Sequence, residues 1–355
     1  MKIKFRWKSQ SWKSQFIAAL FLLAFASGVC AEGRDGWICG PDGCFAAVSE
    51  TKYSGFDAWR LCDGKTEVIV VPALGRVMSF KTESGQNWLW NATFPNGKTP
   101  DTSAWHNWGG DKTWLSPQAN WAQMGAKKGW PPAREWDQNF QSQVLSGGKL
   151  KIWGPVSPVT GLRISRVFYH DANGDFVIEQ TVQQEKGAPI SAGIWSVTQI
   201  DGAKTDAVFV PRSEKSDYDS GFRQLGKSMN GAQPQTVSPT LLQVIPTLSG
   251  DYKIGTDAPR AAIAAVKNGV AFVQRAARPE GKYPDGEAGK SGTAVQLFGT
   301  GEPKSNFLEM ELLSPIYQLK PGARRTHTVR WSLHSLPSED VNDVKNHAAI
   351  DKLLG

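Results

Sequence analysis

The sequence predicts an all-β protein, folded as a large antiparallel β-sandwich. Its 355 residues contain many short segments that alternate between apolar and polar residues or are rich in β-branched residues. Turn sequences such as "DANGD" and "KPGA" separate these segments, and helical periodicity is almost absent before residue 336. The predicted strands are 66–71, 76–81, 149–154, 162–170, 175–183, 192–200, 206–211, 241–245, 269–275, 293–298, 307–313 and 327–333.

Residues 1–31 have the pattern of a secretory signal peptide. Five basic residues precede the apolar run "FIAALFLLAFASGV", and "VCA" ends it with small residues at the positions that precede a cleavage site. The run is too short to span a bilayer comfortably, and no later stretch approaches the required length. We therefore expect cleavage after Ala31, a periplasmic or secreted protein, and no integral membrane segment in the mature chain.

The net charge argues against nucleic acid as a partner. The full chain has a formal charge of +7, and the predicted signal peptide supplies five of these positive charges. The remaining chain is near +2, with mixed signs and no basic stripe that could follow a phosphate backbone. We therefore expect neither nucleic acid nor an anionic membrane surface as a partner.

Residues 32–57 form a glycine-rich lead-in that includes a candidate disulfide loop. In "CGPDGC" the turn-forming residues can bring Cys39 and Cys44 together in an oxidising compartment. We expect these two cysteines to be linked and Cys62 to be free. The alternative is a Cys44–Cys62 pair that leaves Cys39 free. No second cysteine or histidine pair lies nearby at ligand spacing, so we expect no metal site.

Residues 58–335 form the predicted sandwich domain, without a composition break that would mark a linker. Within it, the stretches 91–147 and 212–240 are too long for ordinary turns. Long insertions in compact β domains often carry function. Residues 336–355 predict a C-terminal helix, with Ser338 as the N-cap and acidic residues in the first turn.

Tryptophan is concentrated in and around the first of these insertions. In "WHNWGGDKTWLSPQANW", tryptophans are interleaved with His, Asn, Asp, Lys and Gln. Such a cluster can fill a loop of little regular structure, or it can bind a sugar, whose C–H face stacks on an indole while polar side chains bind the hydroxyls. Packing remains the alternative for any one tryptophan, but a ligand role is favoured for the cluster. The substrate-binding residues predicted here are Trp105, Trp108, Asp111, Lys112, Trp114, Gln118, Trp130 and Asp137.

The glycine pair in this insertion predicts the shape of a binding loop. Gly109 and Gly110 allow the backbone to turn sharply, because glycine adopts positive φ without a steric penalty. We expect Trp114 to lie beneath a sugar on one side of the groove. We expect "GWPPAREWD", stiffened by two prolines, to form the opposite wall.

Four sequence blocks together resemble a known bacterial family. They are "VIVVPALGRVMSFKTESGQNWLW", "WGGDKTWLSPQANW", "GWPPAREWD" and "LEMELLSPIYQLKPG", in this order, within roughly residues 58–333. The family is domain-of-unknown-function family 4380, which is related to galactose mutarotase-like proteins. The resemblance implies a super-sandwich whose concave sheet face holds a carbohydrate. It assigns no reaction.

The resemblance also implies a catalytic glutamate near the C-terminus. In mutarotases a glutamate takes the proton of the anomeric hydroxyl while a histidine protonates the ring oxygen, which requires one base and one acid. Side chains alternate along "FLEMELL", so Glu309 and Glu311 should share the face that points away from the core. Glu311 fits the spacing to the following proline and "LKPG" turn slightly better. The alternative for both is an ordinary solvated strand face.

The mutarotase histidine has no counterpart at its usual place. On the corresponding strand, "GIWSVTQ", this sequence has Trp195 and Gln199, and neither can shuttle a proton at neutral pH. We expect both to bind substrate. His106 is the candidate catalytic replacement, and His170 is a second option.

These residues predict an exported carbohydrate-binding protein that is either sugar-active or purely a binding protein. In the first case it is epimerase-like or glycan-cleaving and uses a glutamate base. In the second it is a non-catalytic glycan-binding or structural envelope protein. Phosphate-loop and zinc-helix motifs are absent from the sequence, so we expect no cofactor.

Overall fold

The computed structural model describes residues 37–40, 43–93, 104–247, 249–301 and 305–355. The signal peptide predicted for residues 1–31 lies outside this range, and its cleavage stays a prediction. No helix in the described part of the chain has the length and apolar character needed to cross a membrane.

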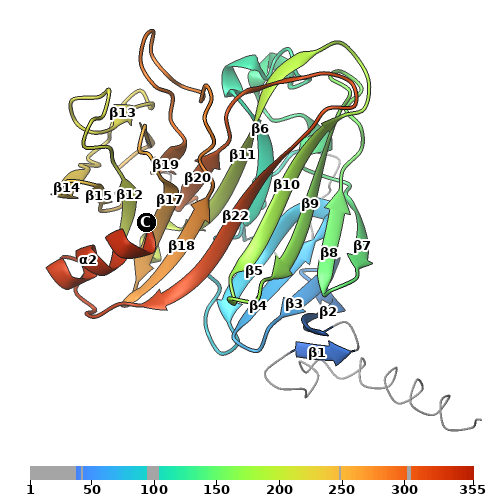
Figure 1. Ribbon diagram of the computed structural model, residues 1–355, viewed down its shortest axis with the longest axis horizontal. Coiled ribbons are helices and arrows are strands. Elements are labelled where there is room, and N and C mark those ends of the chain that lie inside the picture. Colours follow the sequence, from blue (N-terminus) through green and yellow to red (C-terminus); the bar gives the residue numbers. More distant parts are fainter. Residues whose placement is uncertain (1–36, 41–42, 94–103, 248, 302–304) are drawn as a thin grey trace, which may run out of the picture.

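Two large antiparallel sheets form the protein, so the predicted all-β fold is confirmed. Figure 1 shows the strands β22, β10 and β9 of the second sheet lying across those of the first. The first sheet runs in spatial order through β1 (Trp37–Gly40), β2 (Gly43–Tyr53), β3 (Phe56–Cys62), β4 (Thr66–Val71), β5 (Arg76–Thr82), β6 (Asp111–Ser116), β11 (Ile190–Asp201), β20 (Phe307–Leu313), β19 (Val295–Gly299), β16 (Tyr252–Thr256) and β13 (Arg223–Gln224), with β21 (Tyr317–Leu319) paired to β11. The second runs through β14 (Gln235–Ser238), β15 (Leu241–Val244), β12 (Ala207–Pro211), β17 (Ala261–Lys267), β18 (Val270–Ala276), β22 (Arg324–Ser335), β10 (Phe176–Gln184), β9 (Leu162–His170), β8 (Lys149–Trp153) and β7 (Gln141–Leu145).

The main core lies between the two sheets. Phe80 of the first sheet packs against Phe272 and Trp331 of the second, with ring centroids 5.2 Å apart in both pairs. Strand β9 shows how the sequence places its residues, because alternate side chains from Leu162 to His170 are buried. Among the described residues, short 3-10 helices lie in the connections: η2 (Pro72–Leu74), η4 (Gln118–Asn120), η5 (Lys127–Gly129), η6 (Arg134–Trp136) and η7 (Gly202–Lys204).

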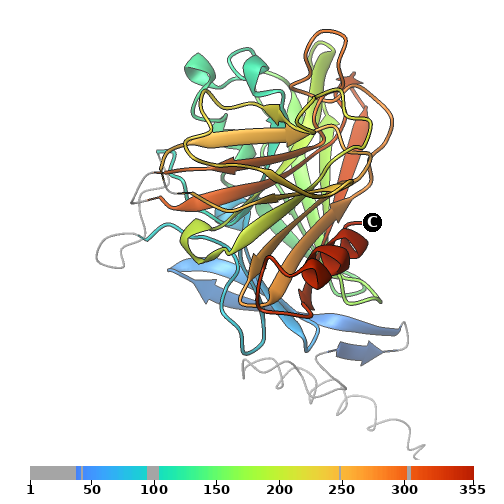
Figure 2. The ribbon, with the colours of Figure 1, turned by 90° about the vertical axis from the view of Figure 1, so that its left-hand side faces the viewer.

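The short C-terminal helix is confirmed, but it begins later than Ser338. Helix α2 (Val344–Leu353) starts after Asp343, whose side chain accepts a hydrogen bond from the backbone N–H of Lys345. The Ser338 hydroxyl instead accepts from the N–H of Asp340, in a turn before the helix. Residues of α2 pack on the outer face of the second sheet, beside β17 and β18 (Figure 1, Figure 2).

The residues expected as an N-terminal lead-in form strands of the first sheet. β2 pairs with β3 along its length from Ala47 to Tyr53, and β3 continues into the predicted domain. The sequence pattern missed β2 because its polar residues lie near the edge of the sheet, where alternation is weak.

The expectation that Cys62 is free is wrong. Cys62 is disulfide-bonded, and it lies buried in β3. Its partner is outside the described side chains. Cys39 and Cys44 occupy directly opposed positions in the β1–β2 pair, but their side chains are also outside that range, so the predicted Cys39–Cys44 link stays a prediction.

Candidate functional site

The candidate site lies on the face of the first sheet that points away from the second. On β20, Leu308, Met310 and Leu312 enter the main core, as predicted from the alternation of "FLEMELL". Glu309 and Glu311 therefore point to the opposite face. The predicted alternative of a solvated strand face does not hold, because both glutamates are buried.

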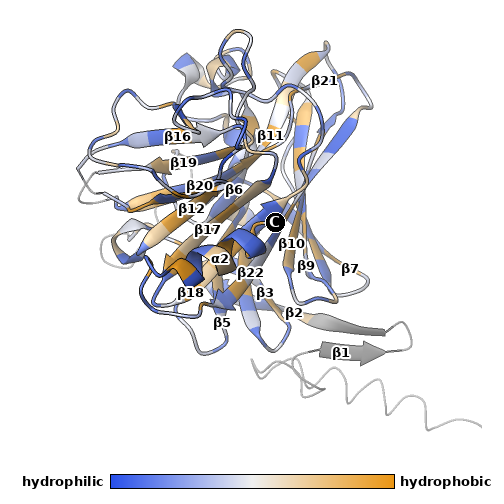
Figure 3. Cartoon of the chain, turned by 60° about the vertical axis from the view of Figure 1, so that its left-hand side comes forward, coloured by the Kyte–Doolittle hydropathy of each residue, from blue (hydrophilic) through white to orange (hydrophobic). Residues whose placement is uncertain are grey.

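The register of three neighbouring strands brings the predicted polar and aromatic side chains to this same face. Glu309 is opposite Gln199 of β11, and Trp195 of β11 is opposite Trp114 of β6. Val197 lies between Glu311 and Lys112 in one row across the strands. Figure 3 shows β11, β20, β19 and β16 side by side. Lys112 and Glu309, which are 197 residues apart in sequence, thus become neighbours on the sheet.

Each glutamate is held by one lysine and one neutral donor. Glu309 Oε1 accepts hydrogen bonds from Lys112 Nζ at 3.1 Å and from Gln199 Nε2 at 2.8 Å. Glu311 Oε2 accepts from Trp195 Nε1 at 3.0 Å and pairs with Lys253 Nζ at 2.9 Å. The ammonium groups also lie over indole rings, Lys112 over Trp114 and Lys253 over Trp195.

The second oxygen of Glu311 is buried and has no hydrogen-bond partner among the described residues. The same holds for the amide oxygens of Gln199 and of Gln296, which lies opposite Glu311 on β19. Buried acceptors normally find a donor; other buried side-chain atoms of the described residues also lack one, and these three are distinguished only by lying together on the face of Glu311. Each of the three oxygens is sealed from solvent, so a ligand hydroxyl could donate to them only after neighbouring side chains move aside.

Burial changes the proton affinities of this cluster. Loss of hydration raises the pKa of Glu311 to about 7, against the opposing attraction of Lys253. Loss of hydration lowers the pKa of Lys112, although the negative charge of Glu309 opposes this. A carboxyl with a pKa near neutrality can both take and return a proton under ordinary conditions.

Asp137 organises the aromatic residues next to the lysine–glutamate cluster. Its two oxygens each accept a hydrogen bond from the Arg76 guanidinium at 2.7 Å. The indole N–H groups of Trp105 and Trp114 also donate to it, at 3.0 and 3.4 Å. These donors occupy both oxygens of Asp137, so its position fits a structural anchor for the loop better than the predicted role in binding a ligand.

Trp114 is not an open platform, because other indoles cover it. It is 3% exposed, and its ring lies 5.3 Å from Trp121, 5.8 Å from Trp195 and 6.0 Å from Trp130. Trp105 also contacts Trp130 at 5.0 Å. The two tryptophan-rich segments therefore pack directly on one another as a single cluster, instead of forming opposite walls of a groove.

Several predicted site residues lie elsewhere. Asp111 points between the sheets, where it forms a fully buried ion pair with Arg166 of β9. Trp108 belongs to a separate apolar cluster, with Phe56 at 5.6 Å, and the His106 ring lies against Trp108 at 5.4 Å. Gln118 is exposed in η4. Side-chain direction in an insertion cannot be read from residue type, which is why these residues could not be sorted from the others by sequence.

The sharp turn expected at the glycine pair is confirmed. Gly109 and Gly110 have φ of 86° and 70°. A Cβ atom at Gly109 would lie 2.2 Å from the Trp90 carbonyl oxygen, and one at Gly110 would lie 2.2 Å from that of Val77. Only glycine fits here, and the turn feeds Lys112 and Trp114 onto the face of the sheet.

Lys253 is a site residue that the sequence pattern did not predict. It lies on β16, a strand that was not predicted, because "DYKIGT" is short and contains a glycine near its end. Its pairing through β19 to β20 brings it to Glu311. No local signal marks it; only the order of the strands in the sheet places it there.

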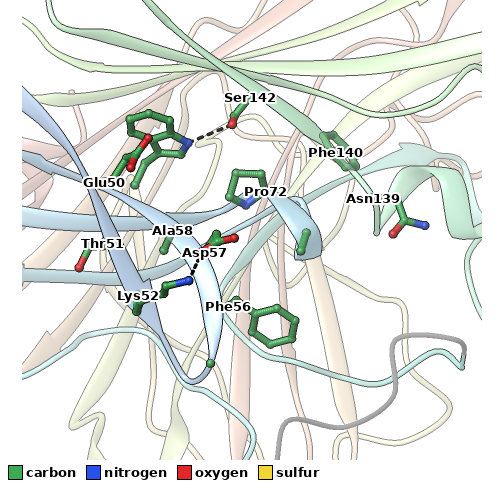
Figure 4. Close-up of a pocket in the computed structure, with 13 residues that line it drawn as sticks. Glu50, Thr51, Lys52, Phe56, Asp57, Ala58, Pro72, Asn139, Phe140 and Ser142 are labelled. Atoms are coloured by element: carbon green, nitrogen blue, oxygen red, sulfur yellow. Dashed lines mark hydrogen bonds and ion pairs between the residues drawn. The ribbon is translucent and has the colours of Figure 1, made fainter.

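A cavity of about 1000 Å³ lies away from these residues, at the end of the sandwich where β2 and β3 approach β7. Figure 4 shows its lining, which includes Phe56, Asp57 and Ser142. The indole N–H of Trp59 donates to the Ser142 hydroxyl at 3.0 Å. Its residues are remote in the sheet order from β20, so this cavity is not the space above Glu311.

Comparisons with known proteins support the fold. The family model described as "Domain of unknown function (DUF4380)" matches residues 58–334. A galactose mutarotase-like protein from Lactobacillus casei ATCC 334 superposes with a TM-score of 0.52 at 10% identity, over 81% of this chain and 100% of that chain. A putative aldose 1-epimerase from Escherichia coli K12 superposes with a TM-score of 0.50 at 10% identity, over 82% and 99%. Comparison with curated proteins found no match. The predicted galactose mutarotase-like super-sandwich is thus confirmed as a fold.

Proposed function

The chain belongs to the DUF4380 family, and from this premise we propose that it is an exported carbohydrate-binding protein. From the geometry of its sheet face we further propose Glu311 as the acid–base group of a sugar-active site. Its fold supports a carbohydrate-related function, because similar structures include a galactose mutarotase-like protein and a putative aldose 1-epimerase. At this low identity the likeness concerns the fold, so the site must supply the chemistry.

The observation that carries the proposal is the state of Glu311. Its carboxyl is fully buried, has a pKa near 7, and keeps one oxygen without a partner among the described residues. Such a group can accept the proton of an anomeric hydroxyl and return it, as an epimerase-like or glycan-cleaving reaction requires. The amide oxygens of Gln199 and Gln296 add acceptors for neighbouring hydroxyls.

Lys112 is the better candidate for the partner acid than His106. The five histidines of the sequence are all in the described residues, and none of their described contacts joins a glutamate of the site. Lys112 shares the face of Glu311, and burial lowers the pKa of its ammonium group towards the range in which it can donate a proton. Lys253 and Trp195 position the Glu311 carboxyl from the other side.

Export is part of the proposal. The basic and apolar pattern of residues 1–31 supports it, and the disulfide at Cys62 adds an independent reason. Disulfides form and persist in the periplasm and outside the cell, whereas cytosolic thiols are kept reduced.

Sugar binding and sugar chemistry can be tested separately. Thermal-shift measurements with a panel of soluble sugars report binding, since a ligand at 100 times its Kd stabilises the folded state by about 3 kcal/mol. Polarimetry or exchange NMR on D-glucose and D-galactose reports anomer interconversion. We expect binding in the wild type and in Glu311→Gln, and interconversion only in the wild type. Interconversion by both proteins would remove Glu311 from the mechanism.

The second candidate is a non-catalytic glycan-binding protein. The lack of a histidine beside the glutamates favours it, because the mutarotase type of reaction uses that histidine. Binding in the thermal-shift assay without interconversion by the wild type would select this candidate.

A further inference from the structure

Trp130 differs from the other tryptophans of its cluster by its exposure. It is 47% exposed, whereas Trp114, Trp121 and Trp136 are almost completely buried. It is also the one aromatic residue among the exposed large hydrophobic side chains of the described chain. An exposed indole offers a large apolar surface on which the C–H face of a sugar could stack.

Three aromatic neighbours fix the orientation of Trp130. Its ring stacks on Trp121 at 6.0 Å with an interplanar angle of 12°. Trp105 and Trp114 meet it at 70° and 90°. One face of the indole is therefore covered by Trp121, while the exposed part of the ring is held rigidly. A rigid aromatic surface loses little conformational freedom when a ligand stacks on it.

A continuous aromatic row connects Trp130 to Glu311. Trp130 lies 6.0 Å from Trp114, Trp114 lies 5.8 Å from Trp195, and the Trp195 N–H donates to Glu311. Two indoles thus separate the exposed ring from the carboxyl. A single pyranose that is hydrogen-bonded to Glu311 is too small to cover Trp130 as well.

We propose that Trp130 forms a second sugar subsite, so that the site takes an oligosaccharide or the end of a glycan chain and not a free monosaccharide. The proposal rests on the proposed function, since it assumes that one sugar unit occupies the sheet face at Glu311. The next unit of the chain stacks its C–H face on the exposed indole. No covalent step involves Trp130.

The test compares single sugars with their oligomers. D-glucose, D-galactose and D-mannose are titrated beside the corresponding β-1,4-linked tetrasaccharides, with calorimetry as the readout, against the wild type, Trp130→Ala and Trp130→Phe. Val159→Ala is the matched control, because Val159 is exposed but is outside the aromatic cluster. Thermal melts confirm that each variant is folded.

We expect a tetrasaccharide to bind the wild type at least about tenfold more tightly than its monosaccharide, the scale of one added aromatic contact. Trp130→Ala should remove this difference and leave monosaccharide binding unchanged. Trp130→Phe should restore part of it, and Val159→Ala should retain it.

The outcomes separate this inference from the proposed function. Equal affinity of the wild type for monosaccharide and tetrasaccharide, or a tetrasaccharide preference that survives in Trp130→Ala, overturns the second subsite and leaves the site at Glu311 intact. Loss of monosaccharide binding in a folded Trp130→Ala variant also overturns it, because Trp130 would then belong to the first subsite. Absence of binding by every sugar tested contradicts the proposed function itself and the second subsite with it.

Discussion

Replacing Glu311 by Gln should make folding stability less sensitive to pH. Burial raises the pKa of this carboxyl from an ordinary 4.5 to about 7 in the folded protein. Between these two values the unfolded chain loses the Glu311 proton while the folded protein keeps it. The contribution of Glu311 to folding stability is therefore fully present below about pH 4.5, and it is lost as the pH rises through 7.

The size of this loss follows from the pKa difference. A change from 4.5 to about 7 corresponds to about 3 kcal/mol, at 1.4 kcal/mol for each unit. Glutamine has nearly the same shape and can still accept the hydrogen bond from Trp195, but it has no charge to bury. Between pH 4 and pH 8, the unfolding free energy of Glu311→Gln should therefore rise by about 3 kcal/mol relative to that of the wild type.

Chemical denaturation of both proteins between pH 4 and pH 8 measures this difference. Taking the difference at each pH removes the contribution of all other titrating groups, provided that they behave alike in the two proteins. Glu214→Gln is the matched control, because Glu214 is exposed and should show no such trend. Parallel stability curves for Glu311→Gln and the wild type would refute the raised pKa and, with it, the reason for assigning Glu311 as the acid–base group.

Three further changes test how the site is held together. Lys112→Met leaves the Glu309 carboxylate without its charged partner and should destabilise the fold by about 3–5 kcal/mol in urea denaturation. Asp137→Asn should cost a similar amount because it leaves the buried Arg76 unpaired, whereas Asp57→Asn in an exposed pair should cost less than about 1 kcal/mol. Gly110→Ala should lower the melting temperature far more than Gly322→Ala, since both have positive φ but only Gly110 has a backbone oxygen in the way; equal effects would contradict the steric argument.

The sequence was sufficient for the fold class because strand alternation is a local property. The face of Glu309 and Glu311 followed correctly from "FLEMELL", and the turn at Gly109 and Gly110 followed from the need for positive φ. Burial of the glutamates could not be predicted in this way. It depends on Lys253 and the aromatic cluster, which reach β20 only through the order of strands in the sheet.

The tryptophan-rich insertion shows a second limit of the sequence. Residue types predicted that it contains sugar-binding aromatics, but Trp108, Trp114 and Trp130 occupy three different environments in the structure. Asp111 and Lys112 are adjacent in the chain and point to opposite faces of β6, so one pairs with Arg166 between the sheets and the other with Glu309. The side-chain alternation that identified the glutamates applies here too, once the strand is known to begin at Asp111.

The arrangement of charge on the sheet face also bears on why Glu311 is there. Asp137 has both oxygens occupied by donors, and Glu309 is bonded to Lys112 and Gln199, so these two carboxylates are compensated for their burial. Glu311 is less well compensated, because burial raises its pKa in spite of Lys253, which is itself 18% exposed. An apolar or amide side chain would be more stable at this position above neutral pH. The proposed acid–base role of Glu311 would account for a destabilising buried carboxyl at this position, because functional sites often carry such a cost in stability.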